Sequence, residues 1–128
     1  MAPNPDPFEG TLDLSVMDQL LNLDDGAVGL LKEMYGLFRE DTPDRIKAIE
    51  MLLGSGDPSD LGDLAHAIKG AAGTMGAVRL RAVAAELEGG ARKADFPVAP
   101  VLLLEQLKEA YAESLKALDA FIAERESV

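Results

Sequence analysis

The 128-residue sequence contains no cysteine, no tryptophan and a single histidine. Without cysteine, the chain can form neither a disulfide framework nor a thiolate metal site. The single histidine and the absence of a Glu-x-x-His pair also argue against a metal-binding helical bundle. Aromatic residues make up only 5% of the chain, so leucine, alanine and other aliphatic side chains must fill most of the core. Such a core suits a bundle of helices.

Basic residues are also few: 12 lysines and arginines stand against 23 aspartates and glutamates, which gives a formal net charge of -11. This charge argues against non-specific binding to nucleic acid or to anionic membranes. No apolar run approaches the roughly 20 residues of a membrane span, and residues 1–10 lack the basic and apolar segments of a secretory signal. We therefore expect a cytoplasmic protein with no nucleic-acid partner and no membrane partner.

The spacing of the apolar residues predicts an all-α fold. Residues 1–11 include three prolines and predict a flexible N-terminal arm, whereas we expect residues 12–128 to form a single helical domain. No stretch shows a convincing strand pattern. The predicted architecture is an antiparallel four-helix bundle with a short additional N-terminal helix.

Short signals predict where the helices begin and end. Ser15, with Asp18 three positions on, resembles a capping box that would open the short first helix. The apolar spacing keeps its phase across Thr42-Pro43, so we expect one long helix bent at the proline rather than two helices. Gly89-Gly90 is a candidate end for a helix that starts near Ala77. The other two expected helices run from Pro58, capped by Asp57, to about Met75, and from about residue 98 to residue 124.

The only histidine, His66, lies within the helix predicted from Pro58. A projection of this helix at about 100° per residue, with Ile68 at the centre of the buried face, places His66 about 160° away. We therefore expect the imidazole to be exposed near the middle of the helix. Lys69 falls at the edge of the same outer face.

Glycines surround this histidine, although each one costs a helix interior roughly 1 kcal/mol relative to alanine. In the projection, Gly62, Gly70 and Gly73 lie with Asp63 on the outer face, where packing within the bundle does not explain them. We interpret them as a flat surface that lets the backbone of another protein approach the imidazole closely. Gly62, Asp63, Gly70 and Gly73 are the expected partner-docking residues.

The stretch "AHAIKGAAGTMGA", residues 65–77, resembles the signature of histidine-containing phosphotransfer (HPt) domains. In that signature His-x-Leu/Ile-Lys-Gly is followed, six residues after the glycine, by another glycine. The flanking stretches "LFREDTPDRIKAIEMLL" and "RLRAVAAELEGGARK" resemble the neighbouring helices of the family. The residues that match the signature position by position are His66, Ile68, Lys69, Gly70 and Gly76.

The resemblance implies a phosphorelay protein in which His66 is the phosphorylated nucleophile. A neutral imidazole is nucleophilic without an activating base. His66 would pass a phosphoryl group between aspartates of receiver domains, or from a kinase to a receiver. Lys69, one turn away, would offset charge on the phosphoryl oxygens. Glu88 matches a glutamate that orients the histidine in chemotaxis-type domains, with a plain solvated carboxylate as the alternative.

The resemblance also implies what the partner contributes. This chain would bind no metal and no cofactor, and Mg²⁺ would come with the partner receiver domain of a response regulator or hybrid histidine kinase. The partner would therefore catalyse the transfer, and this chain would act as an intermediate rather than as an enzyme. We expect a free-standing monomer.

The sequence departs from the family at Ala71, Ala72 and Thr74, where members often carry serine and asparagine. Ala71 and Ala72 face inward in the projection, so these changes should alter packing rather than the site. One alternative function stays open at this point. A non-phosphorylated helical adaptor, or pseudo-HPt scaffold, would bind a signalling partner through the same surface without receiving a phosphoryl group.

Overall fold

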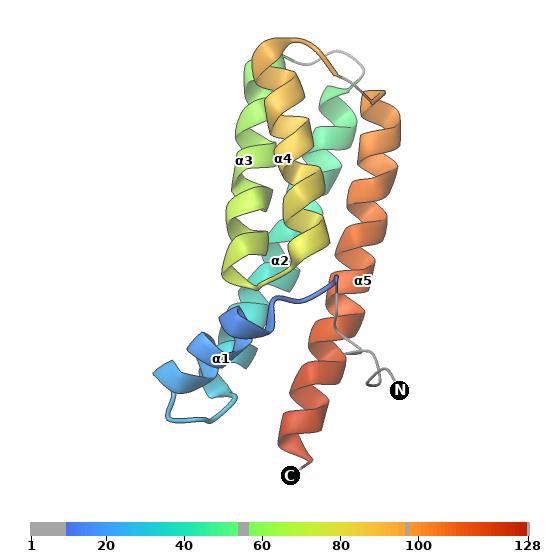
Figure 1. The fold of residues 1–128 in the computed structure, drawn as a ribbon. Helices are drawn as coiled ribbons and strands as arrows, with labels where there is room; N and C mark the ends of the chain where they lie inside the picture. The colour runs from blue at the N-terminus through green and yellow to red at the C-terminus, as the bar shows by residue number, and fades with distance from the viewer. Residues whose placement is uncertain (1–9, 54–56, 97, 128) are drawn as a thin grey trace, which may run out of the picture.

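Four long helices and one short helix make up the computed structural model, which describes residues 10–53, 57–96 and 98–127 (Figure 1). Helices α2, α3, α4 and α5 run antiparallel in chain order, and each contacts two of the others to close a four-helix bundle. The short α1 packs against α2 near one end of the bundle. The predicted fold class is confirmed. The helices are α1 (Leu14–Leu23), α2 (Gly29–Leu52), α3 (Pro58–Thr74), α4 (Val78–Lys93) and α5 (Pro100–Glu126).

Leucine is the most frequent residue of the core, and aliphatic side chains make up most of the rest, as the scarcity of aromatic residues requires. Each helix turns one apolar stripe inward, at the spacing that the 3.6-residue turn dictates. None of the described helices is long and apolar enough to cross a membrane. The largest side chains that are almost completely buried are Met17, Leu31, Ile49, Ile68, Met75, Leu80, Leu87, Leu103, Leu107 and Leu118.

Helix α2 is continuous through Pro43, so the prediction of one long helix is confirmed. A proline inside a helix cannot donate a hydrogen bond to the carbonyl one turn earlier. The side chain of Pro43 lies on the exposed side of α2, where its ring does not disturb the core. The flanking apolar positions Phe38 and Ile46 are both buried, which fits the unbroken phase of the apolar pattern.

The predicted start of α1 is wrong by two residues. Asp13, not Ser15, is the N-cap, and its carboxylate accepts hydrogen bonds from the Ser15 backbone N–H at 2.9 Å and from the Ser15 hydroxyl at 2.6 Å. Aspartate and serine are about equally good caps. The chain before the helix determines which of the two residues is the cap, because the N–H of Asp13 donates to the Gly76 carbonyl at 2.7 Å.

Gly89 and Gly90 do not end α4, contrary to the sequence interpretation. The helix continues to Lys93 and ends at Ala94, which adopts a left-handed conformation with φ of 53°. The side chain of Phe96 folds back against α4 and explains why residue 90, inside the helix, is a glycine. A methyl group added at Gly90 would lie 2.2 Å from the Phe96 ring, so only glycine leaves room for this contact.

The ends of α3 follow the sequence prediction. The Asp57 carboxylate accepts from the Ser59 N–H at 2.8 Å, and Pro58 occupies the first turn. Gly76 leads into α4 with a positive φ of 66°. The Thr11 carbonyl accepts from the Val78 N–H at 3.1 Å, so the last residue of the expected flexible arm is held to the α3–α4 turn. Residues 1–9 of that arm lie outside the described residues.

Candidate functional site

His66 stands near the middle of α3 with 64% of its side chain exposed. Ile68, two residues on, is completely buried. The two side chains point in nearly opposite directions because two residues turn a helix by about 200°. The predicted exposure of the imidazole is therefore confirmed. The surrounding α3 positions Ala65 and Ala72 are also buried, so the bundle holds α3 in one rotation about its axis.

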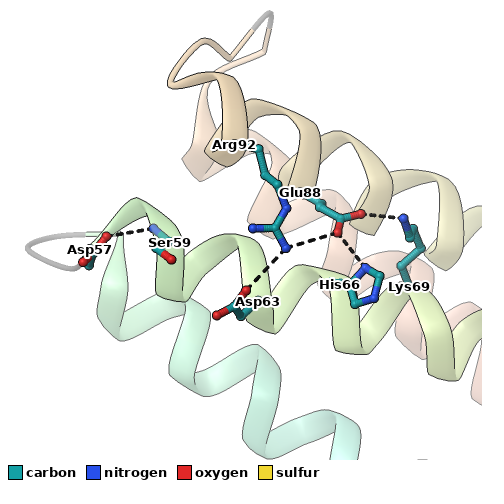
Figure 2. Close-up of polar contacts among 7 residues, drawn as sticks. All are labelled: Asp57, Ser59, Asp63, His66, Lys69, Glu88 and Arg92. Atoms are coloured by element: carbon teal, nitrogen blue, oxygen red, sulfur yellow. Dashed lines mark hydrogen bonds and ion pairs between the residues drawn. The ribbon is translucent and has the colours of Figure 1, made fainter.

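A carboxylate from α4 contacts the imidazole (Figure 2). His66 Nδ1 lies 2.6 Å from Glu88 Oε2, and Lys69 Nζ donates to the other oxygen, Glu88 Oε1, at 2.5 Å. Only 13% of the Glu88 side chain is exposed, against 31% for Lys69. Glu88 is thus not a plain solvated carboxylate but the centre of a polar cluster that spans α3 and α4.

The charge state of Glu88 decides which ring nitrogen carries the hydrogen. The hydrogen bond from Lys69 is the main cause that lowers the pKa of the Glu88 carboxyl, with a further contribution from His66. An ionised carboxylate has no hydrogen to donate. In the Glu88 contact, Nδ1 of His66 must therefore be the donor. This assignment follows from the hydrogen-bond network, and it leaves the lone pair of a neutral ring on Nε2.

Arg92 joins this cluster from the next turn of α4. Its Nη2 lies 3.3 Å from Asp63 Oδ1 and 3.6 Å from Glu88 Oε2 (Figure 2). Arg92 is not among the site residues predicted from the sequence. One signal could have found it: Arg92 follows Glu88 by four residues, which places both on one face of a helix.

The structure divides the expected docking residues into two groups. Gly70 is exposed, with no atom within 4 Å of an added methyl group, and the Asp63 side chain is 69% exposed. Gly62, in contrast, is buried, which corrects the expectation that it lies on an open surface. An added methyl group there would lie 3.2 Å from Arg92 Nη1. A side chain of α4 covers this glycine, and a projection of α3 alone cannot reveal it.

Gly73 is half-buried for a related reason. Its added methyl group would lie 3.6 Å from Arg81 Nε, also a side chain of α4. Arg81 and Lys69 face a surface hollow of about 380 Å³ that Gly70, Gly73 and Thr74 also line. The open surface beside His66 is therefore centred on Gly70 and has cationic side chains at its edge.

The chemistry of the site is that of a nucleophile with nearby positive charge. Among the described residues, no group of three or more histidine, aspartate or glutamate side chains is arranged to hold a metal ion. The exposed imidazole has Lys69 and Arg92 within the same cluster, and both cations also contact Glu88. Such an arrangement can accept an anionic group on Nε2 and offset part of its charge.

Comparisons with known proteins agree with this geometry. The Hpt domain family matches residues 33–121, a range that includes His66, Lys69, Glu88 and Arg92. The structure is similar to the crystal structure of histidine-containing phosphotransfer protein B (HptB) from Pseudomonas aeruginosa PAO1, with a TM-score of 0.76 and 27% identity. That similarity covers 94% of this chain and 98% of the other. A search of curated protein sequences gave no match.

Two plant structures share the fold. One is the histidine-containing phosphotransfer protein MtHPt2 from Medicago truncatula, with a TM-score of 0.76 and 22% identity over 93% of this chain and 81% of that one. The other is ZmHP2 from maize, with a TM-score of 0.75 and 19% identity over 92% of this chain and 86% of that one. At these identities the similarity concerns the fold alone.

Proposed function

The chain belongs to the Hpt domain family and is a histidine phosphotransfer protein of a phosphorelay, and we propose that His66 carries the phosphoryl group. One observation carries this assignment. The only histidine of the chain is exposed, and Glu88 occupies its Nδ1 at 2.6 Å, which leaves the Nε2 lone pair for attack. Nε2 of His66 is therefore the proposed nucleophilic atom.

The transfer step uses this arrangement directly. The Nε2 lone pair attacks the phosphorus of an aspartyl phosphate on a receiver domain, or of a phosphate ester or anhydride bound by a kinase. A nitrogen–phosphorus bond forms, the phosphorus–oxygen bond of the donor breaks, and the donor oxygen leaves with the bonding electrons. The ring becomes cationic while Nδ1 keeps its hydrogen, and the adjacent Glu88 carboxylate offsets that charge. The reverse attack, by the aspartate of the next receiver, returns the ring to neutrality.

Lys69 is proposed to offset charge on the phosphoryl oxygens. Its ammonium group has three donors, and the Glu88 contact uses one of them. The others can reach a phosphoryl oxygen without releasing Glu88. Lys69 lies three residues from His66, so the two side chains are neighbours on the helix surface.

The partner supplies the remaining parts. Hpt proteins are phosphorelay intermediates, so we assign the catalysis, the acceptor aspartate and its Mg²⁺ to the partner receiver domain or kinase. The partner is proposed to dock over Gly70, with Asp63 and Gly73 at the rim of the same surface; Gly62 leaves the proposed docking set because Arg92 covers it. We propose that the protein acts as a cytoplasmic monomer.

The experiment that tests the proposal is phosphorylation of the purified protein by a phosphorylated receiver or a kinase. We expect phosphate that acid releases and base does not, which is the behaviour of a phosphohistidine. His66→Gln should abolish this labelling and leave the helical circular dichroism unchanged, because the imidazole lies outside the core. The adaptor alternative predicts a stable complex with the partner and no labelling. Labelling that persists in the His66→Gln variant would disprove the site.

A further inference from the structure

Two arginines of α4 lie across two glycines of α3, on either side of the His66–Glu88 contact. The glycines are eleven residues apart, and so are the arginines. Eleven residues are close to three full helical turns, so all these positions lie along the same face of each helix. Because α3 and α4 run antiparallel, the order along one helix reverses along the other. The facing pairs are Gly62 with Arg92, His66 with Glu88, and Gly73 with Arg81.

Only one of the two arginines contacts the histidine cluster. Arg92 Nη2 lies 3.3 Å from Asp63 Oδ1 and 3.6 Å from Glu88 Oε2. Arg81 has no acidic partner among the described residues. Each arginine therefore packs against a glycine of α3, but only Arg92 contacts Glu88. Arg81 is a matched control for Arg92.

Glu88 is held from two sides along the axis of α3. Lys69, which binds Oε1, lies on the C-terminal side of His66, whereas Asp63, which anchors Arg92, lies on its N-terminal side. Without Arg92, only the Nδ1–H of His66 would hold Oε2 against the attraction of Lys69 for Oε1. The oxygen that Arg92 faces is Oε2, the same oxygen that accepts from Nδ1.

Gly62 gives Arg92 the space for this contact. A methyl group at this position would lie 3.2 Å from Nη1 and 3.5 Å from Cζ of Arg92, so a larger side chain must displace the guanidinium. At Gly73 the nearest atom of Arg81 would be 3.6 Å from the added methyl group, which is an ordinary contact. The closer fit is at the arginine that contacts Glu88.

We propose that Arg92, seated on Gly62 and anchored by Asp63, is a positioning residue that holds Glu88 on Nδ1 of His66 and so keeps Nε2 free for phosphorylation. This inference rests on the proposed function of His66. Arg92 acts through Glu88 and contacts neither the phosphoryl group nor the reacting nitrogen. The side chains of Arg92 and Asp63 are about half and two-thirds exposed, and exposed ion pairs add little to stability. The effect of Arg92 should therefore appear in the imidazole and hardly in the melting temperature.

The test reads the imidazole directly, by long-range ¹H–¹⁵N correlation spectra of the ¹⁵N-labelled protein at a pH where the ring is neutral. The chain has one histidine, so the spectrum contains one imidazole and needs no side-chain assignment. We expect the native protein to show hydrogen on Nδ1. Arg92→Gln should shift the ring toward the form with hydrogen on Nε2, which a neutral imidazole prefers in water. Arg81→Gln should leave the native spectrum unchanged.

A second pair of variants keeps both arginines and changes the glycines against which they pack. Gly62→Leu should displace Arg92 and reproduce the shift of Arg92→Gln, whereas Gly73→Leu should displace only Arg81 and leave the imidazole spectrum native. This pair decides the question even if Arg92→Gln folds poorly. Labelling of Arg92→Gln by a small phosphodonor should fall by about three- to tenfold, less than the roughly hundredfold that a misplacement of about 1 Å can cost, because Nδ1–H of His66 can still donate to Glu88 in part of the molecules.

Native tautomer populations in both Arg92→Gln and Gly62→Leu would overturn the proposal, as would an equal shift in the Arg81 and Gly73 variants. These outcomes are independent of whether His66 is phosphorylated. The proposed function fails separately, if the native protein takes up no acid-labile phosphate on His66.

Discussion

Glu88 of α4 accepts a hydrogen bond from Nδ1 of His66 of α3, with 2.6 Å between the two atoms. The orientation of the imidazole is thus a property of two helices rather than of the motif around the histidine. The bundle supplies the alignment, because Leu87 beside Glu88 and Ile68 near His66 are both completely buried. Core packing fixes the rotation of each helix, and that rotation brings the two polar side chains together on the surface.

Replacing Glu88 should slow phosphorylation without unfolding the protein. In Glu88→Ala the ring loses its acceptor, and the hydrogen should move in part to Nε2, the proposed nucleophilic atom. We expect labelling by a small phosphodonor to fall by about ten- to a hundredfold, within the range that orientation of a reacting group can supply. The measurement is the initial rate of phosphate incorporation. Glu86→Ala, an exposed glutamate of the same helix, is the matched control and should react at the native rate. Equal rates in the two variants would contradict the role of Glu88.

Lys69→Ala should reduce phosphotransfer without abolishing it. The variant would lose the cation proposed to lie beside the phosphoryl oxygens, whereas the Mg²⁺ proposed for the partner would remain. We expect a slower receiver-dependent transfer, or a phosphohistidine of shorter lifetime, in a protein that folds normally. The rate of transfer and the decay of the isolated phosphoprotein are the two measurements. Lys47→Ala, an exposed lysine of α2, serves as the control. If neither quantity changes in Lys69→Ala, Lys69 is only a solvated charge.

Gly70→Leu should stabilise the helix and weaken transfer from the partner. Leucine is a better helix former than glycine by up to about 1 kcal/mol, and no atom lies within 4 Å of an added methyl group at Gly70. The melting temperature should therefore stay equal or rise. The added side chain would stand on the proposed docking surface one turn from His66, so receiver-dependent transfer should fall much more than labelling by a small phosphodonor. Parental transfer by this variant would show that Gly70 does not lie under the partner.

The stability of the fold should decline at alkaline pH because of Tyr35. Burial and the hydrogen bond that its hydroxyl donates to Asp119 at 2.6 Å both raise the pKa of Tyr35. The unfolded chain then loses this proton before the folded protein does, so the stability that Tyr35 contributes is fully present below the unfolded pKa of about 10 and is lost as the pH rises above it. Urea titrations at about pH 9 and about pH 11, on either side of that pKa, measure the decline in the free energy of unfolding. Tyr35→Phe should show a smaller decline, and an equal decline in both proteins would contradict the assignment to Tyr35.

Much of this fold could be predicted from the sequence because the strongest signals are local and periodic. Asp57 and Pro58 start α3, and the inward position of Ile68 fixes the outward position of His66. Both follow from helix geometry alone. The continuity of α2 through Pro43 could be predicted for the same reason, because the apolar residues before and after the proline fall on one face of a single helix.

The errors concern contacts between segments that a single-helix projection does not contain. The projection places Gly62 on the exposed face because it does not contain α4, whose Arg92 covers this glycine. Gly90 resembles a helix end in the sequence because the ring that requires glycine there belongs to Phe96, six residues further along the chain. The partners of Glu88 were likewise open until the alignment of α3 with α4 was known. In each case the deciding contact comes from outside the helix that is projected, and helix propensity cannot report it.

The central claim, that Nε2 of His66 receives the phosphoryl group, is tested most directly by the spectrum of the single imidazole after phosphorylation. The ¹⁵N-labelled protein is phosphorylated through its receiver or kinase, and long-range ¹H–¹⁵N correlations identify the nitrogen that has formed the bond to phosphorus. We predict the new bond at Nε2, with hydrogen kept on Nδ1 next to Glu88. A phosphorylated protein whose imidazole spectrum is unchanged, or whose Nδ1 carries the phosphorus, would contradict the account.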